Sequence, residues 1–157
     1  MANTTKLQIP ILTAAQAQKH VTVNEGMQQI EDTLGRSFGE NGSFLQPFCV
    51  EEELTGLSGA TAVSTIAFPN QCIILGCSLR VTTLITGATS FDCGDGSNAS
   101  RFGGSLGVAL GSTNQGTVGP VGNYSSTPIT LTANGGNFTA GAVRLALMYL
   151  YLQPPTA

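Results

Sequence analysis

The sequence predicts a mainly β protein, a jelly-roll-like antiparallel β-sandwich that follows a short N-terminal arm and helix. Three observations support this prediction. From Phe48 onward, Thr, Ser, Gly and β-branched residues dominate the sequence. Turn signals recur there about every eight to twelve residues, a spacing typical of sandwiches and barrels. A helical period occurs only before this point, within residues 13–35.

Composition favours a protein that packs against other proteins. The chain has 157 residues, which fits one domain with an appendage. Only 10% of them are charged, well below the roughly 25% of an ordinary soluble domain. The formal net charge of −3 argues against a nucleic-acid groove, and no apolar run approaches the roughly 20 residues that cross a membrane. The first residues lack a signal-peptide pattern, so we expect synthesis in the cytoplasm.

Residues 1–12 predict an extended apolar arm. Leu7, Ile9 and Ile11 alternate with polar residues, and Pro10 opposes a helix interior. An arm this short cannot bury its own apolar side chains. We therefore expect it to lie on its own domain or on a neighbouring protein.

Residues 13–35 predict the helix, which we place at about 23–34. Two capping boxes precede it, and Met27, Ile30 and Leu34 recur at helical spacing. Three apolar residues are too few to stabilise an isolated helix. We therefore expect it to pack on a partner helix, most simply its own copy in an oligomer. Residues 1–35 are thus predicted to serve attachment to a partner or oligomerisation.

A hinge and a β-domain complete the predicted organisation. Residues 36–47 are rich in Gly, Ser and Asn and predict a flexible hinge, and residues 48–153 predict the β-sandwich domain. Turns are expected at Leu57–Ala60, Pro69-Asn70, Gly87-Ala88, Gly94–Gly96, Gly103-Gly104, Gly111-Ser112, Gly119-Pro120 and Asn134–Gly136. The last of these predicts a hairpin in which Gly135 or Gly136 takes a positive φ.

Two strands carry the clearest patterns. In Ser78–Thr86, Leu79, Val81 and Thr83 share one face, which we predict to be buried. The stretch 142–151 is largely apolar on both faces, so it predicts a strand that is either central in a two-layer fold or covered by a neighbouring subunit. Gln153 and the two prolines after it predict its end, because proline cannot donate to a ladder.

No group of residues predicts catalysis or metal binding. His20 is the only histidine and has no nucleophile motif nearby, so we interpret it as structural. Glu51-Glu52-Glu53 predicts a solvated strand edge rather than a catalytic pair. The acidic loop 92–98 lacks the spacing of a calcium loop, and turn chemistry explains its residues. The four cysteines lack zinc-ligand spacing and are interpreted as small core residues, so no cofactor or metal is expected.

Two blocks of the sequence carry a family resemblance. Residues 7–25, which include Gln-Ala-Gln-Lys-His-Val-Thr-Val-Asn-Glu, and body segments such as 74–82 and 131–139 resemble a family of phage and prophage proteins of unknown function. Related proteins are encoded in gene transfer agents, where they are similar to head-spike or fibre components. The resemblance spans nearly the whole chain and implies a structural virion protein without catalytic residues. Longer relatives carry extra sequence between the two blocks, so its absence here favours a base, stalk or decoration role.

The resemblance and the apolar patterns together give the expected partners and contacts. The residues expected to bind the virion or a partner are Leu7, Ile9, Ile11, Gln16, Gln18, Lys19, His20, Asn24, Met27, Ile30 and Leu34. Expected partners are further copies of the chain, with a trimer favoured and a pentamer as the alternative, and capsid, portal-vertex or fibre proteins. The expected location is the surface of the virion head or tail.

A second class of function stays open at the level of sequence. The chain is alternatively a carbohydrate-binding module that contacts polysaccharide on the host surface. Tyr124 is the best exposed aromatic candidate for such a contact. A glycan hydrolase is a third hypothesis, from another class again.

Overall fold

A computed structural model describes residues 42–155 of the chain, and the predicted arm, helix and first part of the hinge lie outside these residues. Residues 46–152 form one compact unit. The described residues form eight strands and no helix. The strands are β1 (Phe44–Thr55), β2 (Thr61–Phe68), β3 (Cys72–Thr86), β4 (Ser90–Gly94), β5 (Gly103–Leu106), β6 (Thr113–Asn123), β7 (Thr127–Asn134) and β8 (Ala140–Gln153).

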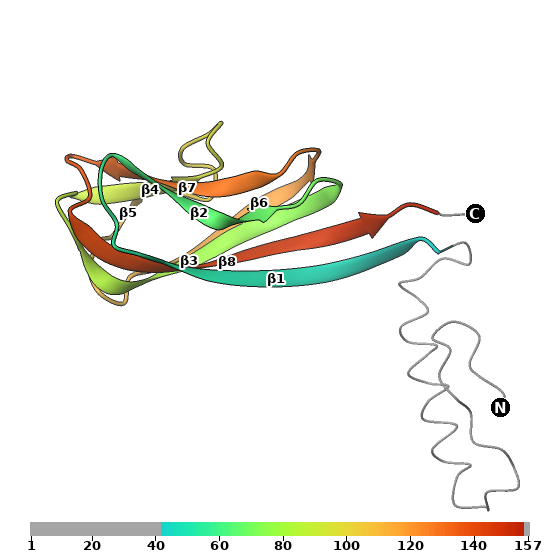
Figure 1. The fold of residues 1–157 in the computed structure, drawn as a ribbon, viewed down its shortest axis with the longest axis horizontal. Helices are drawn as coiled ribbons and strands as arrows, with labels where there is room; N and C mark the ends of the chain where they lie inside the picture. The colour runs from blue at the N-terminus through green and yellow to red at the C-terminus, as the bar shows by residue number, and fades with distance from the viewer. Residues whose placement is uncertain (1–41, 156–157) are drawn as a thin grey trace, which may run out of the picture. The chain divides into compact units, whose positions relative to one another are not determined.

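The strands form two four-stranded sheets that pack face to face (Figure 1). The order is β1-β8-β3-β6 in one sheet and β2-β7-β4-β5 in the other. The pairs with a defined register are all antiparallel. Eight strands divided in this order between two sheets form a jelly roll, so the predicted fold class is confirmed.

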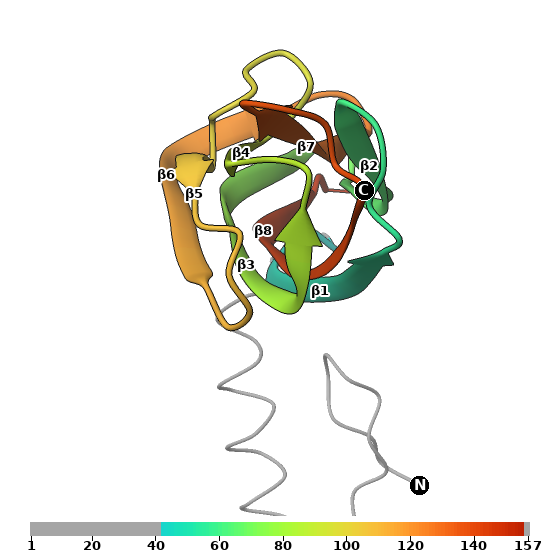
Figure 2. The same ribbon diagram turned by 90° about the vertical axis from the view of Figure 1, so that its left-hand side faces the viewer.

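The connections of the jelly roll lie at two opposite ends. We call the end where β1 begins and β8 ends the proximal end. Cys72 at the start of β3 pairs there with both Asn123 and Tyr151, so the turns 69–71 and 124–126 share this end. The opposite, distal end holds the connections 56–60, 87–89, 107–112 and 135–139, and Figure 2 shows the body from that end. Backbone hydrogen bonds join these distal connections, for example from Gly59 N to Phe138 O at 2.9 Å.

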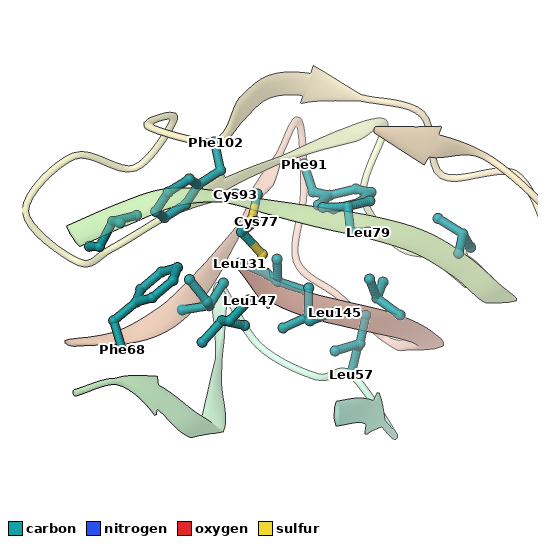
Figure 3. Packing of buried hydrophobic residues seen from close by; sticks show 14 of the residues in the cluster. Leu57, Phe68, Cys77, Leu79, Phe91, Cys93, Phe102, Leu131, Leu145 and Leu147 are labelled. Carbon is teal, nitrogen blue, oxygen red and sulfur yellow. The ribbon is translucent and has the colours of Figure 1, made fainter. Parts of the chain in front are cut away.

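The core lies between the two sheets (Figure 3). Its fully buried side chains include Val81, Leu145 and Leu147 from one sheet and Phe91 and Leu131 from the other. Each such residue contributes roughly 1.5–3 kcal/mol when it leaves water. In these four strands, β3, β4, β7 and β8, buried residues mostly alternate with more exposed ones, so the alternation indicates which face turns inward.

The two strands with the clearest patterns are confirmed in outline. In β8, Val143, Leu145, Leu147 and Tyr149 are buried, and the strand is central, between β1 and β3. In β3, the prediction for Thr83 is wrong because that side chain is exposed. A register shift between Val81 and Thr83 adds a residue relative to β8. The buried alternation is therefore interrupted at Thr83 and Leu84, and Ile85 is buried again.

The predicted hairpin at 134–136 is wrong. β7 pairs with β2 and β4, whereas β8 pairs with β1 and β3, so this turn crosses between the sheets. Gly135 nevertheless has φ 69°, as the turn prediction required. A side chain at Gly135 would also clash with the Thr89 hydroxyl, so both the backbone angle and the space require glycine.

Two other predicted turns are strand residues. Gly103-Gly104 opens β5, a short edge strand. Gly119-Pro120 lies inside β6, which is also an edge strand, at the register shift opposite Ile74 and Gly76. An edge strand tolerates proline at a bulge because no neighbour needs its amide. β1 begins at Phe44, within the stretch that the sequence assigned to the hinge.

Candidate functional site

Tyr124 lies in the proximal turn between β6 and β7, and its side chain is the most exposed among the large apolar residues of the described chain, at 88%. A Cβ placed on Gly122 would lie 3.3 Å from the Tyr124 hydroxyl oxygen, so the ring lies over this glycine. A larger residue at Gly122 would displace the ring. The structure thus confirms an exposed aromatic surface here, which can stack on an apolar face of a ligand.

Asn123 holds the Tyr124 turn rigidly against the rest of the proximal end. Its buried side-chain nitrogen donates to the carbonyl oxygens of Pro69 at 2.7 Å and Ser125 at 2.6 Å. Its side-chain oxygen accepts a hydrogen bond from the Thr127 hydroxyl at 2.9 Å. A buried, fully paired amide of this kind fixes local geometry. Sequence reasoning missed this residue, because its partners at 68–69 are distant in the sequence.

Glu52 is not a free carboxylate but a bridge between the two sheets. Its carboxylate oxygens accept hydrogen bonds from Thr65 N at 2.9 Å, from Ile66 N at 3.0 Å and from the Thr65 hydroxyl at 2.9 Å. These two amides lie within the register shift of β2, between Val63 and Ala67, where Ser64 Oγ accepts a hydrogen bond from Ile129 N of β7. Glu52 therefore joins edge strand β1 to edge strand β2.

Hydrogen bonding also sets the charge state of Glu52. Burial raises the pKa of this carboxyl, but the hydrogen bonds from Ile66 N, Thr65 N and the Thr65 hydroxyl lower it more. The net effect is a pKa below the ordinary value, so the carboxylate form is favoured. A general acid needs the opposite shift.

The neighbouring glutamates point to solvent from the edge of the first sheet. Glu53 Oε2 accepts a hydrogen bond from Arg144 Nη2 on β8 at 3.0 Å, and both groups are exposed. Glu51 is exposed as well. The predicted solvated edge agrees with these exposures for Glu51 and Glu53, whereas Glu52 turns toward β2 and is only partly exposed.

The acidic loop after β4 is occupied by its own hydrogen bonds. Asp95 Oδ1 accepts from Asn98 N at 2.8 Å and from Ser97 N at 3.1 Å, and its other oxygen pairs with Arg101. Asp92 Oδ1 accepts from Ser105 N and from Asn134 Nδ2, both at 2.7 Å. These contacts are turn and strand chemistry. Within residues 42–155, no cluster of three or more His, Cys, Asp or Glu side chains could hold a metal ion.

The four cysteines are free thiols, and three of them are buried. Cys77 from β3 and Cys93 from β4 approach each other across the core, as Figure 3 shows. The hydrogen bond with the Cys77 thiol, followed by burial, raises the pKa of Cys93, and burial raises the pKa of Cys72. Raised pKa values suppress the thiolate, so neither thiol is an activated nucleophile.

The remaining residues of the predicted site lie outside the described residues. They are Leu7, Ile9, Ile11, Gln16, Gln18, Lys19, His20, Asn24, Met27, Ile30 and Leu34. The roles assigned to them stay predictions. Within residues 42–155 no helix is long and apolar enough to span a membrane.

Comparison with known proteins includes a structural similarity to a phage protein. The chain is similar to a solved chain of the capsid asymmetric unit of cyanophage Pam1, with 21% sequence identity and a TM-score of 0.49. The similarity covers 91% of this chain and 99% of the other. At this identity and TM-score it carries no argument about function. No protein-family model and no curated protein matches the chain.

Proposed function

We propose that the chain is a non-enzymatic structural protein of a phage virion, a spike, fibre or decoration component anchored through its N-terminal segment. The family resemblance of both sequence blocks supports this proposal. The observation that carries it within the described residues is the arrangement of the jelly roll, in which β1 begins at the proximal end. Residues 1–41 thus join the body at one end and leave the four distal connections at the other.

The state of the polar groups also supports a structural role. The carboxylates of Glu52, Asp92 and Asp95 accept hydrogen bonds from backbone or side-chain donors in their own fold. Each therefore stabilises an edge or a turn. Incubation of the purified protein with host capsular polymer tests this part of the proposal, because we expect no shortening of the polymer.

Locating the protein in a reconstruction of the intact particle tests the main proposal. We expect a jelly-roll density at the particle surface, with the proximal end toward the particle. A chain that begins at Gly42 keeps all eight strands, so we expect it to fold and to be absent from particles. If this truncated chain decorates particles that lack the full-length protein, the docking surface lies on the jelly roll and the anchoring role of residues 1–41 is wrong.

A carbohydrate-binding role is the second candidate, and the exposure of Tyr124 favours it. Its position bears on how such a site would work, because Tyr124 lies at the proximal end, where residues 1–41 join. In an anchored protein this end faces the particle rather than the host. A glycan array with the wild-type protein and with Tyr124→Ala separates the two roles. The structural role predicts that no glycan on the array binds the wild type and fails to bind Tyr124→Ala.

A further inference from the structure

Five apolar side chains lie together on the outer face of the β1-β8-β3-β6 sheet. They alternate along β3 and β8 with side chains that point into the core, and none of the five belongs to the core or packs against it. Ile73 and Leu150 are direct cross-strand partners in this set, and Leu152 is 39% exposed. We call this set the outer apolar patch, and its members are Ile73, Leu75, Met148, Leu150 and Leu152.

The outer face of the other sheet is mainly polar toward its distal end. There, Thr132 of β7 lies between Thr61 of β2 and Asp92 of β4 in direct cross-strand register. The next row pairs Thr130 with Val63, which is an isolated exposed apolar residue. These rows present mainly hydroxyl and carboxylate groups, whereas the outer apolar patch lies near the proximal end of the first sheet. In the patch of the first sheet, Leu152 is exposed and the other four side chains are partly exposed. Contiguous apolar surface that water can reach marks an interaction site.

Charged residues lie on the distal side of the patch, and they are negative on the β1 edge and positive on the β3 edge. Glu51 and Glu53 lie on β1, and Arg80 lies on β3, across the width of β8. Glu53 is paired with Arg144 of its own chain. Among residues 42–155, neither Glu51 nor Arg80 makes an ion pair. The face thus has an acidic flank on β1 and a basic flank on β3. Each flank has one charged residue that forms no ion pair within residues 42–155.

We propose that the outer apolar patch is the interface with a second copy of this chain, in a ring or pair whose rotation axis runs parallel to β8. Such an axis brings the acidic flank of one copy against the basic flank of the next, so Glu51 meets Arg80 of the neighbouring copy. It also keeps the proximal ends of all copies together, where 41 further residues join each body. This inference deepens the proposed function, because it rests on a homo-oligomeric virion protein.

The two parts of the face contribute differently. The apolar patch supplies most of the affinity, because burying aliphatic side chains stabilises an interface more than exposed ion pairs do. The flanking charges set orientation, because complementary charges favour one register and disfavour others more than they add affinity.

The test compares the oligomeric state of full-length variants by sedimentation and light scattering, with circular dichroism to check the fold. Leu150→Glu places a charge in the patch, and we expect at least a hundredfold weaker association. The matched control is Val63→Glu on the outer face of the other sheet, where we expect no change. If Leu150→Glu associates like the wild type, or if the wild type is a monomer at every concentration, the inference is wrong.

A charge reversal keeps the test decisive if Leu150→Glu fails to fold. Arg80 is exposed, so Arg80→Glu leaves the core unchanged. We expect it to weaken association about tenfold, and we expect Glu51→Arg in the same chain to restore it. Absence of both effects would overturn the proposed register of the flanks.

The proposed function fails independently of this interface. Mass spectrometry of purified particles measures incorporation, whereas sedimentation uses no particles. If Leu150→Glu disrupts the oligomer but purified particles lack the protein, the interface stands and the virion role is wrong. If the protein is found in particles but Leu150→Glu does not change its association, the virion role stands and the interface is wrong.

Discussion

Replacing Glu52 should weaken the closure between the two sheets more than replacing either neighbouring glutamate. Its carboxylate accepts hydrogen bonds from Thr65 N, Ile66 N and the Thr65 hydroxyl, which belong to the other sheet. A hydrogen bond to a charged group contributes about 1.5–3 kcal/mol when it is protected, and less where water competes. We take about 0.7 kcal/mol for each of the three donors, because Thr65 is exposed. Glu52→Ala should therefore cost about 2 kcal/mol.

The corresponding shift in melting temperature is large enough to measure. For a body of this size, 1 kcal/mol corresponds to about 4 °C, so Glu52→Ala should melt about 8 °C lower than the wild type. Glu52→Gln keeps one oxygen acceptor but loses the charge, so we expect about half of that loss. Glu51→Gln is the matched control and should stay within about 0.5 kcal/mol of the wild type. All melts use one protein concentration, because association also contributes to stability.

The effect should also depend on pH in a defined direction. The folded pKa of Glu52 is below its ordinary value of 4.5, so the unfolded chain takes up the proton more readily. Its contribution is then complete above about pH 4.5 and is lost as the pH falls through the folded pKa. We therefore expect the difference between wild type and Glu52→Gln to shrink in acid. The reasoning is refuted if Glu52→Gln and Glu51→Gln melt together at pH 7, or if the difference is unchanged at pH 3.

Three further expectations follow from the same structure. Gly135→Val should cost about 1–3 kcal/mol in a thermal melt, because φ is 69° and the new side chain meets Thr89, whereas Gly119→Val, with open space, is the near-neutral control; equal melting temperatures would remove this turn assignment. At most one thiol per folded chain, that of Cys49, should react with a thiol reagent at neutral pH, and four should react after unfolding; rapid reaction of a second thiol would contradict the described core. Molar sodium chloride should leave the oligomer associated, because apolar area holds it together, and dissociation by salt in sedimentation would contradict that account.

The sequence predicted those parts of the fold that local patterns determine. The inward face of β8 could be read from Val143 to Tyr149, because side chains alternate in any strand. The exposure of Thr83 could not be read, because the bulge depends on how β3 is paired with β8. The turn at Gly135 shows the same division, since its φ was predictable but the sheet that receives the next strand was not.

In the candidate site, too, some residues could be identified from local sequence and others only from the fold. Tyr124 could be proposed as exposed because Gly, Asn and Ser surround it and mark a turn. The roles of Glu52 and Asn123 were hidden, because each is hydrogen-bonded to residues that the fold alone brings near. In the sequence, the only sign of the outer apolar patch was that the stretch forming β8 is apolar on both faces. Its neighbours on β3 became known once the register was known.

The division of the jelly roll into a proximal and a distal end also decides where foreign sequence can be grafted. A peptide fused after Gln153, where β8 ends, emerges at the proximal end, beside the start of β1. A peptide inserted at 107–112 emerges at the opposite end, where Leu110 is 69% exposed. Exposed loop tips are also the positions at which chains tolerate insertions. A vaccine epitope or an affinity tag intended for display would therefore be better placed within this loop than at the end of β8.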